Sequence, residues 1–278
     1  MKKWGSYKYY WRILKAILRG QAFIIPYRYR SDNIPLAQYD RIEAHFKKSA
    51  ELERHLVLLS SYAEDLDRIE GDASAPEPRW NQDWFPALDA SAYYTMIRLY
   101  RPSRIVEIGA GHSTRFALRA IKDGALDTHL HVIDPVPRAD LDRSNNQLSW
   151  HAHKLEEIDP AFWESLASGD ILFIDSSHIL MPGTDLDYLL NVILPVLPKN
   201  MLVHFHDIFL PKAYPKEWHW RGYNEQQAIA GLLFNPQWSV LFSSRYALSS
   251  GLAGRIVPKI LESADHGLAS SLWLRKEE

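Results

Sequence analysis

Short runs of aliphatic and β-branched residues alternate with stretches of helical spacing between residues 104 and 276. Such alternation is typical of parallel strands joined by right-handed helical crossovers. We therefore predict an α/β fold of the Rossmann-like, doubly wound type, with a mainly parallel seven-stranded sheet. The seven runs are RIVEIG (104–109), HLHVID (129–134), QLSWHAH (147–153), DILFID (170–175), MLVHFHD (201–207), WSVLFSS (238–244) and SSLWLRK (270–276).

The segment before this pattern has a different character. Between residues 36 and 69, apolar residues recur mostly three or four apart with charges between them, which predicts a long amphipathic helix or a helix pair. The stretch GDASAPEPRWNQD (71–83) ends it, because glycine and proline interrupt helices. We place the domain boundary there, with an N-terminal helical extension at 1–83 and the α/β domain at 84–278.

Two helices within the α/β domain are expected at 185–194 and 224–234. Asn224 and Gln227 have the spacing of a capping box, in which each side chain satisfies a backbone N–H of the first helical turn. The helix that follows the first strand is expected to end near Gly124.

The stretch VEIGAGHST (106–114) leaves a strand, turns on Gly109 and Gly111, and starts a helix. The first N–H groups of a helix in this position favour a nucleotide ligand. Asp134, at the end of the next strand, is placed to accept hydrogen bonds from ribose hydroxyls. A dinucleotide site would require glycine where Thr114 stands, and Glu107 is a poor neighbour for phosphates but suits a cationic ligand.

At these residues the chain resembles the class I S-adenosylmethionine-dependent methyltransferases, whose first motif has the form E-x-G-x-G and whose second strand ends in an acid. The resemblance covers residues 84–278 and implies an antiparallel last strand. It also implies S-adenosylmethionine as cofactor, with Asp134 at the ribose. The residues that it places at the methionine end or beside it are Glu107, Gly109, Gly111, His112 and Ser113.

Polar side chains follow the fourth and fifth predicted strands. Asp175, His206 and Asp207 should face the same crevice as the glycine turn, because ligands in open α/β sheets bind outside the carboxyl ends of the strands. His204 lies two residues before His206 and so shares its face of the strand. Being nearer the core, His204 is interpreted as a hydrogen-bonded packing residue.

The same positions are similar to those of metal-dependent O-methyltransferases that act on catechols and macrolide sugars. That resemblance implies Asp175, His206 and Asp207 as ligands of a divalent cation, Mg²⁺ or Mn²⁺. His206 stands where the family has a carboxylate, so its imidazole either shifts the preference toward Mn²⁺, Fe²⁺ or Zn²⁺ or is not a ligand. His178 is the expected general base, since histidine suits proton abstraction at neutral pH, and His206 is the alternative base.

Between the fifth strand and the helix at 224–234 lies a proline-punctuated aromatic segment that is interpreted as a lid. It contains Trp218, His219, Trp220 and Tyr223, which would stack on a sugar or aromatic acceptor, or would simply cover the edge of the sheet.

The overall charge excludes some partners. With 32 basic and 34 acidic residues the net charge is −2, so no nucleic-acid partner is expected. The absence of cysteine excludes disulfides and thiolate metal sites, and allows a reducing compartment. No apolar run reaches the roughly 18 residues that cross a bilayer, and we expect a cytoplasmic protein.

Residues 1–30 are an exception to this charge balance, because they contain eight lysines and arginines and no acid. A helix at about 8–19 is one candidate for peripheral membrane contact. Docking on the chain's own core or on a second copy in a homodimer is favoured, because the expected apolar face is short and partly tyrosine.

The function predicted from these features is transfer of a methyl group from S-adenosylmethionine to a hydroxyl of a small molecule or saccharide, assisted by a divalent metal. The alternatives are a nucleotide-dependent oxidoreductase or epimerase, and a non-catalytic scaffold of the same fold. Thr114, Glu107 and the lack of a Tyr-x-x-x-Lys pair argue against the first alternative. Retention of both Gly111 and Asp134 argues against the second.

Overall fold

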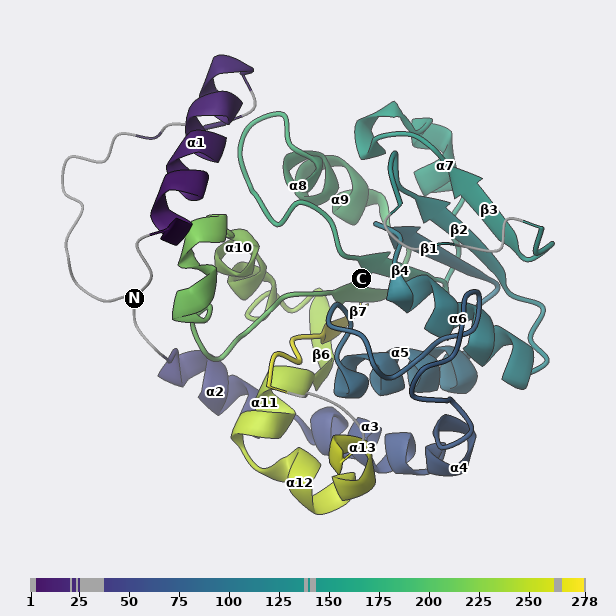
Figure 1. Ribbon diagram of the computed structural model, residues 1–278. Coiled ribbons are helices and arrows are strands. Elements are labelled where there is room, and N and C mark those ends of the chain that lie inside the picture. The colour runs from purple at the N-terminus through teal and green to yellow at the C-terminus, as the bar shows by residue number, and fades with distance from the viewer. Residues whose placement is uncertain are drawn as a thin grey trace. The chain divides into compact units, whose positions relative to one another are not determined.

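The computed structural model describes residues 4–20, 22–23, 25, 38–137, 140, 144–262 and 267–277 (Figure 1). The chain divides into two compact units, residues 1–35 and 36–278. The smaller unit contains helix α1 (Trp4–Leu18). Four of its basic residues, Lys2, Lys3, Arg28 and Arg30, lie outside the described residues. No described helix combines the length and the apolar character needed to cross a membrane.

The larger unit is built on one seven-stranded sheet with the order β3-β2-β1-β4-β5-β7-β6. Strands β1 to β5 pair in parallel, and β7 is antiparallel to both of its neighbours. Both the fold class and the antiparallel last strand predicted from the sequence are confirmed. The strands are β1 (Arg104–Ile108), β2 (His129–Ile133), β3 (Leu148–His151), β4 (Ile171–Ile174), β5 (Leu202–Phe205), β6 (Trp238–Ser243) and β7 (Leu272–Lys276).

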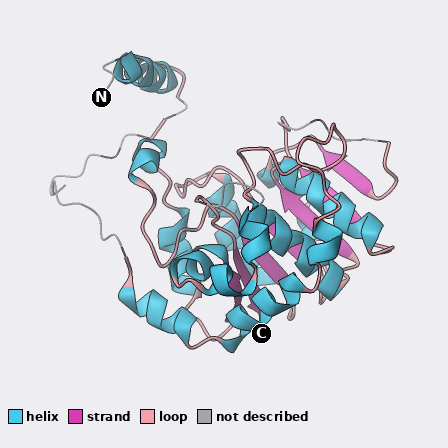
Figure 2. Cartoon of the chain, turned by 60° about the horizontal axis from the view of Figure 1, so that its bottom comes forward, coloured by secondary structure: helices cyan, strands magenta, loops and turns pink. Residues whose placement is uncertain are grey.

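Helices cover both faces of the sheet, so that the strands run through the interior (Figures 1 and 2). On one side lie α3 (Ala50–Ser60), α4 (Ala63–Leu66), α5 (Ala87–Tyr100), α6 (His112–Asp123), α11 (Ser244–Ser249), α12 (Leu252–Ile256) and α13 (Pro258–Glu262). On the other side lie α2 (Asp40–Lys47), α7 (Pro160–Glu164), α8 (Asp185–Tyr188), α9 (Leu194–Val196) and α10 (Glu225–Leu232). Short 3-10 helices occupy Leu155–Glu157 and Lys216–Arg221, and a π-helical turn, Leu189–Ile193, joins α8 to α9.

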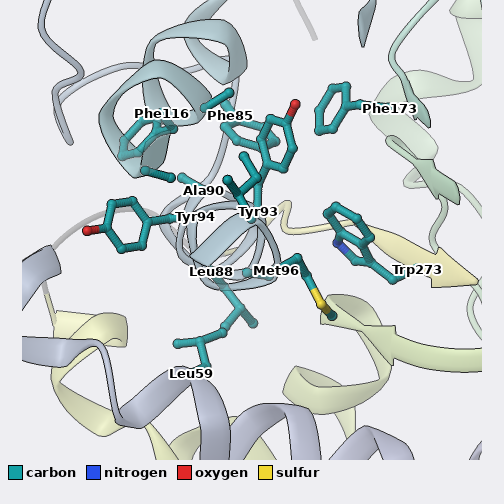
Figure 3. Packing of buried hydrophobic residues seen from close by; sticks show 14 of the residues in the cluster. Leu59, Phe85, Leu88, Ala90, Tyr93, Tyr94, Met96, Phe116, Phe173 and Trp273 are labelled. Atoms are coloured by element: carbon teal, nitrogen blue, oxygen red, sulfur yellow. The ribbon is translucent and has the colours of Figure 1, made fainter. Parts of the chain in front are cut away.

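The period of two along each strand divides the core into two layers. In β4, Ile171 and Phe173 face α5, whereas Leu172 and Ile174 face the opposite helices. Figure 3 shows the α5 layer, in which Tyr93 packs against Phe173 with ring centroids 4.3 Å apart. The same alternation places polar residues of β1 and β5 on the α5 side. This layer therefore forms the floor of the polar site at the strand ends.

The extension predicted at 36–69 consists of the separate helices α2, α3 and α4 rather than one long helix. These helices contribute Phe46, Leu56 and Leu59 to the two layers of the core. The boundary predicted between residues 83 and 84 therefore lies within the larger compact unit. The predicted capping box at Asn224 is wrong, because its side chain makes no cap hydrogen bond to α10.

Candidate functional site

The turn after β1 lies directly against the end of β4. Gly109 has a φ of +88°, and a Cβ at this position would lie 2.0 Å from the backbone oxygen of Asp175. Only glycine satisfies both conditions. Asp134, just after β2, joins this turn to the second strand. One of its carboxylate oxygens accepts from the Ala110 N–H and the other from the Val136 N–H, each at 2.8 Å. The structure thus brings together the glycine turn, Asp134 and the end of β4.

Replacing Gly109 by alanine should therefore destabilise the fold by about 3 kcal/mol or more, because the new methyl group meets backbone and the φ is strained. Gly111→Ala is the matched control. Gly111 has an extended φ of −166°, and a Cβ there would meet nothing within 4 Å. Chemical denaturation should show a loss within about 1 kcal/mol for Gly111→Ala. Equal stability of the two variants would contradict the close approach of the turn to β4.

Glu107 is a fully buried acid beneath this turn. Neither of its carboxyl oxygens has a hydrogen-bond partner of good geometry, although the hydroxyls of Ser113 and Thr114 face it. Burial raises the pKa of Glu107 to about 8, and the two hydroxyls moderate the rise. A buried, unpartnered carboxyl group favours a cationic ligand group beside it.

The polar ends of β4 and β5 meet in a second cluster. His178 Nε2 lies 3.2 Å from Asp175 Oδ1 and 3.5 Å from Asp207 Oδ2. Among the described residues, these three form the one group whose ligand atoms lie within 4.8 Å of one another as a metal site requires. The Asp175 side chain is 39% exposed, whereas those of His178 and Asp207 are 4% and 11% exposed. The cluster is therefore open to solvent on the Asp175 side.

His206 lies next to this cluster and takes part in its ion pairs. Its Nδ1 is 3.7 Å from Asp175 Oδ1 and 3.5 Å from Asp207 Oδ1. The predicted metal set of Asp175, His206 and Asp207 is thus brought together, but the tightest set contains His178 in place of His206. His204 is a fully buried packing residue, as predicted, with Nε2 2.7 Å from the Ser271 hydroxyl.

Each of the two imidazoles is held by a buried carboxylate on its far side. His178 Nδ1 lies 2.7 Å from Glu225 Oε2, and His206 Nε2 lies 3.2 Å from Asp89 Oδ2. A carboxylate only accepts hydrogen bonds, so these nitrogens carry the hydrogens. The opposite nitrogens, Nε2 of His178 and Nδ1 of His206, then face the Asp175 and Asp207 carboxylates.

The Asp175 and Asp207 carboxylates favour positive charge on the His178 and His206 imidazoles or between them. Burial by itself would lower the pKa of His178, but hydrogen bonds to Asp175 and Glu225 hold it well above its usual value. The pKa of His206 is raised in the same way by Asp207 and Asp175, against the effect of its burial. The cluster therefore binds either protons on the imidazoles or a cation.

The loop that carries His178 is fastened to the start of α10. The Asn224 side chain accepts from the Leu180 N–H at 2.7 Å and donates to its carbonyl at 3.1 Å, and the Asn224 N–H donates to the His178 carbonyl. This is what the Asn224 side chain does instead of capping α10. His178 itself has a φ of +60°. The Asn224 contacts hold this strained residue in position.

Of the four aromatic residues singled out in the predicted lid, Tyr223 contacts the cluster. The ring of Tyr223 lies 4.5 Å from that of His178. Trp218 packs on Phe209 and carries the Arg221 guanidinium 4.0 Å above its ring, so it is part of the segment's own packing. Trp220 is 58% exposed. The aromatic surface beside the cluster is therefore formed by Tyr223.

The remaining predicted cofactor residues lie at the first turn of α6. His112 begins the helix, and burial together with nearby arginines lowers its pKa to about 4. Ser113 is buried. A neutral imidazole beside Gly111 leaves the helix N-terminus free of a competing positive charge.

Comparison with known proteins agrees with this geometry. Residues 106–208, from β1 to the end of β5, match a family model described as a methyltransferase domain. An uncharacterised protein of Archaeoglobus fulgidus is 32% identical over 165 residues, which cover 55% of this chain and 68% of that protein. The chain therefore has a methyltransferase domain.

Several solved methyltransferases are similar to the chain, at low identity and with TM-scores below 0.5. The S-adenosylhomocysteine-bound enzyme PaMTH1 of Podospora anserina is 15% identical, with a TM-score of 0.42 over 92% of this methyltransferase and 100% of that chain. A CmcI structure with Mg and S-adenosylmethionine is 17% identical (TM-score 0.44; 94% and 95% covered). MycE, from the mycinamycin biosynthetic pathway, is 14% identical (TM-score 0.40; 79% and 54% covered).

Sequence reasoning missed two residues of the methyltransferase site, Asp89 and Glu225. Asp89 stands in the otherwise apolar first turns of α5, and a lone acid in a stretch destined for burial is a signal in itself. Its carboxylate also accepts from the Ser270 and Ser271 N–H groups at 2.9 and 3.0 Å. Glu225 had no such local signal, since an acid in the first turn of a helix is ordinary.

Proposed function

We propose that this methyltransferase transfers a methyl group from S-adenosylmethionine to a hydroxyl of a small molecule or saccharide, with a divalent cation at the strand ends. The observation that carries the proposal is the contact between two sites. The Gly109 turn, where the cofactor would bind, lies against the backbone of Asp175, which belongs to the acid and histidine cluster. A hydroxyl bound at the cluster would therefore lie beside the cofactor's methyl group.

The donor set fits a divalent cation. The Nδ1 of His206 lies 3.7 Å from Asp175 Oδ1 and 3.5 Å from Asp207 Oδ1, separations that suit neighbouring positions around an ion with bonds of about 2.1 Å. The imidazole favours Mn²⁺, Fe²⁺ or Zn²⁺ over Mg²⁺. When bound, such an ion lowers the pKa of the acceptor hydroxyl and fixes its position. We assign Asp175, Asp207 and His206 to this ion.

His178 is assigned as the base. Glu225 fixes its Nδ1 hydrogen, and a cation bound by Asp175 and Asp207 would displace the proton that these carboxylates favour on Nε2, so that Nε2 could accept the proton of the acceptor hydroxyl. The acceptor oxygen then attacks the methyl carbon, an O–C bond forms, and the S–C bond breaks to leave S-adenosylhomocysteine. Tyr223, which packs on the His178 ring, offers an aromatic face to the acceptor. That face supports a sugar ring or an aromatic ring as the acceptor body.

The experiment that tests this function is titration of the full-length protein with S-adenosylhomocysteine, followed by labelled methyl transfer to a panel of catechols and sugars with Mn²⁺. We expect micromolar binding, weakened about tenfold or more in Asp134→Ala because the ribose loses a charge-assisted acceptor. Asp159→Asn is the matched control, since Asp159 only caps α7. Absence of adenosyl binding in the wild type would overturn the proposal.

Cofactor binding should also release a proton from Glu107. In the free protein its pKa of about 8 keeps it neutral at pH 7, and the cofactor's α-ammonium favours the carboxylate. The bound state therefore holds fewer protons, so affinity should rise with pH up to about 8 and level off above it. Calorimetry in buffers of different ionisation enthalpy measures the release, and Glu107→Gln should abolish it. A pH-independent affinity in the wild type would contradict this assignment.

A further inference from the structure

Helix α1 and the residues after it expose large apolar side chains. Trp11 is 65% exposed and Leu18 is 78% exposed, and Tyr10, Phe23 and Ile25 are each more than half exposed. Burying side chains of this size is strongly favourable. A helix that presents them needs a surface to cover them.

The charges of this helix are arranged on one side. With 3.6 residues per turn, positions 8, 12, 15 and 19 fall on a stripe of about 60°. All four are lysine or arginine, and residues 1–30 contain no acid. Next to this stripe lies an apolar arc, on which positions 4, 7, 11, 14 and 18 fall. Positions 10, 13 and 17 widen the arc to about half of the helix circumference. The described side chains of this apolar arc are Tyr10, Trp11, Ile13, Leu14, Ile17 and Leu18.

We propose that α1 binds the surface of an anionic lipid bilayer, with its axis in the plane of the interface. A wide apolar arc rich in tryptophan and tyrosine beside a cationic stripe is the pattern of interfacial helices. The helix has 15 residues and is about 22 Å long, too short to cross a hydrocarbon core of about 30 Å. It therefore lies on a bilayer rather than across it.

The sequence favoured docking of this helix on protein over contact with a membrane, and the structure of α1 favours the membrane. The sequence predicted a helix from about residue 8, with a short apolar face, whereas α1 begins at Trp4, and its described residues expose Tyr10, Trp11, Leu14 and Leu18. Pairing α1 with a second copy through the apolar arc would leave both cationic stripes without a counter-charge, since residues 1–30 offer no acid to neutralise them. An anionic lipid surface would neutralise the cationic stripe with its headgroups and bury the apolar arc against its acyl chains.

The test is co-sedimentation of the full-length protein with vesicles. Vesicles of phosphatidylcholine with about one third phosphatidylglycerol should bind the protein, phosphatidylcholine alone should bind it poorly, and high salt should weaken binding. Each basic residue near such a surface contributes about fivefold, so Lys15→Glu with Arg19→Glu should reduce partitioning by about 25-fold or more. Trp11→Ala with Leu18→Ala should also reduce it, by removing apolar contact with the lipid.

The matched control is Lys47→Glu with Lys48→Glu, which makes the same charge change at exposed positions in and just after α2. It should bind vesicles nearly as the wild type does. Equal loss in this control, or no binding of the wild type to anionic vesicles, would overturn the proposal. So would a dimer by light scattering that Trp11→Ala converts to a monomer, since that result gives the face to a second copy. S-adenosylhomocysteine affinity in the same variants should stay unchanged, which separates this test from that of the proposed function.

Discussion

Replacing His178 by alanine will lower the rate of methyl transfer by about 10² to 10⁴-fold, the range typical of a lost general base. The His178 side chain is buried, and its Nε2 faces the Asp175 and Asp207 carboxylates where the acceptor hydroxyl would bind. S-adenosylhomocysteine affinity should change little, because Asp134 and the glycine turn are untouched. Single-turnover transfer of a labelled methyl group, paired with calorimetry, measures both quantities.

Two companion variants sharpen this result. Glu225→Gln keeps an oxygen acceptor for His178 Nδ1 but removes the charge, so it should lose less activity than Glu225→Ala. The Mn²⁺ affinity of His178→Ala distinguishes its two candidate tasks. Retained affinity with lost turnover fits a base, whereas loss of both makes His178 the third ligand in place of His206. Full turnover in His178→Ala would remove this residue from the mechanism.

Removing both carboxylates with Asp175→Asn and Asp207→Asn should weaken Mn²⁺ binding by more than about 100-fold, since even outer partners of metal ligands contribute 10 to 100-fold. These two acids belong to every ligand set that the structure allows. Electron paramagnetic resonance of free Mn²⁺ measures the loss directly. Asp159→Asn serves as the control, because its side chain caps α7 and lies outside the cluster.

A loss of metal binding has this meaning only if the variant is folded. Thermal unfolding in the presence of a chelator should stay cooperative but occur at a somewhat lower temperature, because the amides keep oxygen acceptors beside His178 and His206 but remove the charges that pair with the two imidazoles. S-adenosylhomocysteine binding should also persist. Wild-type affinity for Mn²⁺ in the double variant would place the metal elsewhere. The acids and histidines at the strand ends would then act only in proton transfer.

The sheet could be predicted because each strand is a short buried run bounded by turn residues. RIVEIG and DILFID correspond to β1 and β4 within one residue at each end. The parallel pairing follows from the crossovers, and it brings Gly109, Asp134, Asp175 and His206 to one edge of the sheet. The strand positions and their pairing were both predictable, because buried strands joined by helical crossovers pair in parallel.

The outer partners of the site could not be predicted, because they come from elements far apart in the sequence. Asp89 reaches His206 from α5, across 117 residues, and Glu225 reaches His178 from α10. Asn224 was misinterpreted for a related reason. Its spacing to Gln227 suggests a cap on α10. In the structure the Asn224 side chain instead forms hydrogen bonds with the backbone N–H and carbonyl of Leu180. Periodicity carries no information about such long-range competition.

The place of β7 determines when the site can assemble. It is the last strand in the chain, yet it lies between β5 and β6. The residues just before it supply the N–H groups that hold Asp89 and the Ser270 hydroxyl that contacts Asp207. During synthesis, β1 to β5 emerge first and can pair in order, but β6 has no neighbour until residue 276 has left the ribosome. We therefore expect the cluster of Asp175, His178, His206 and Asp207 to form only after translation of the whole domain, with β5 exposed as an open edge until then.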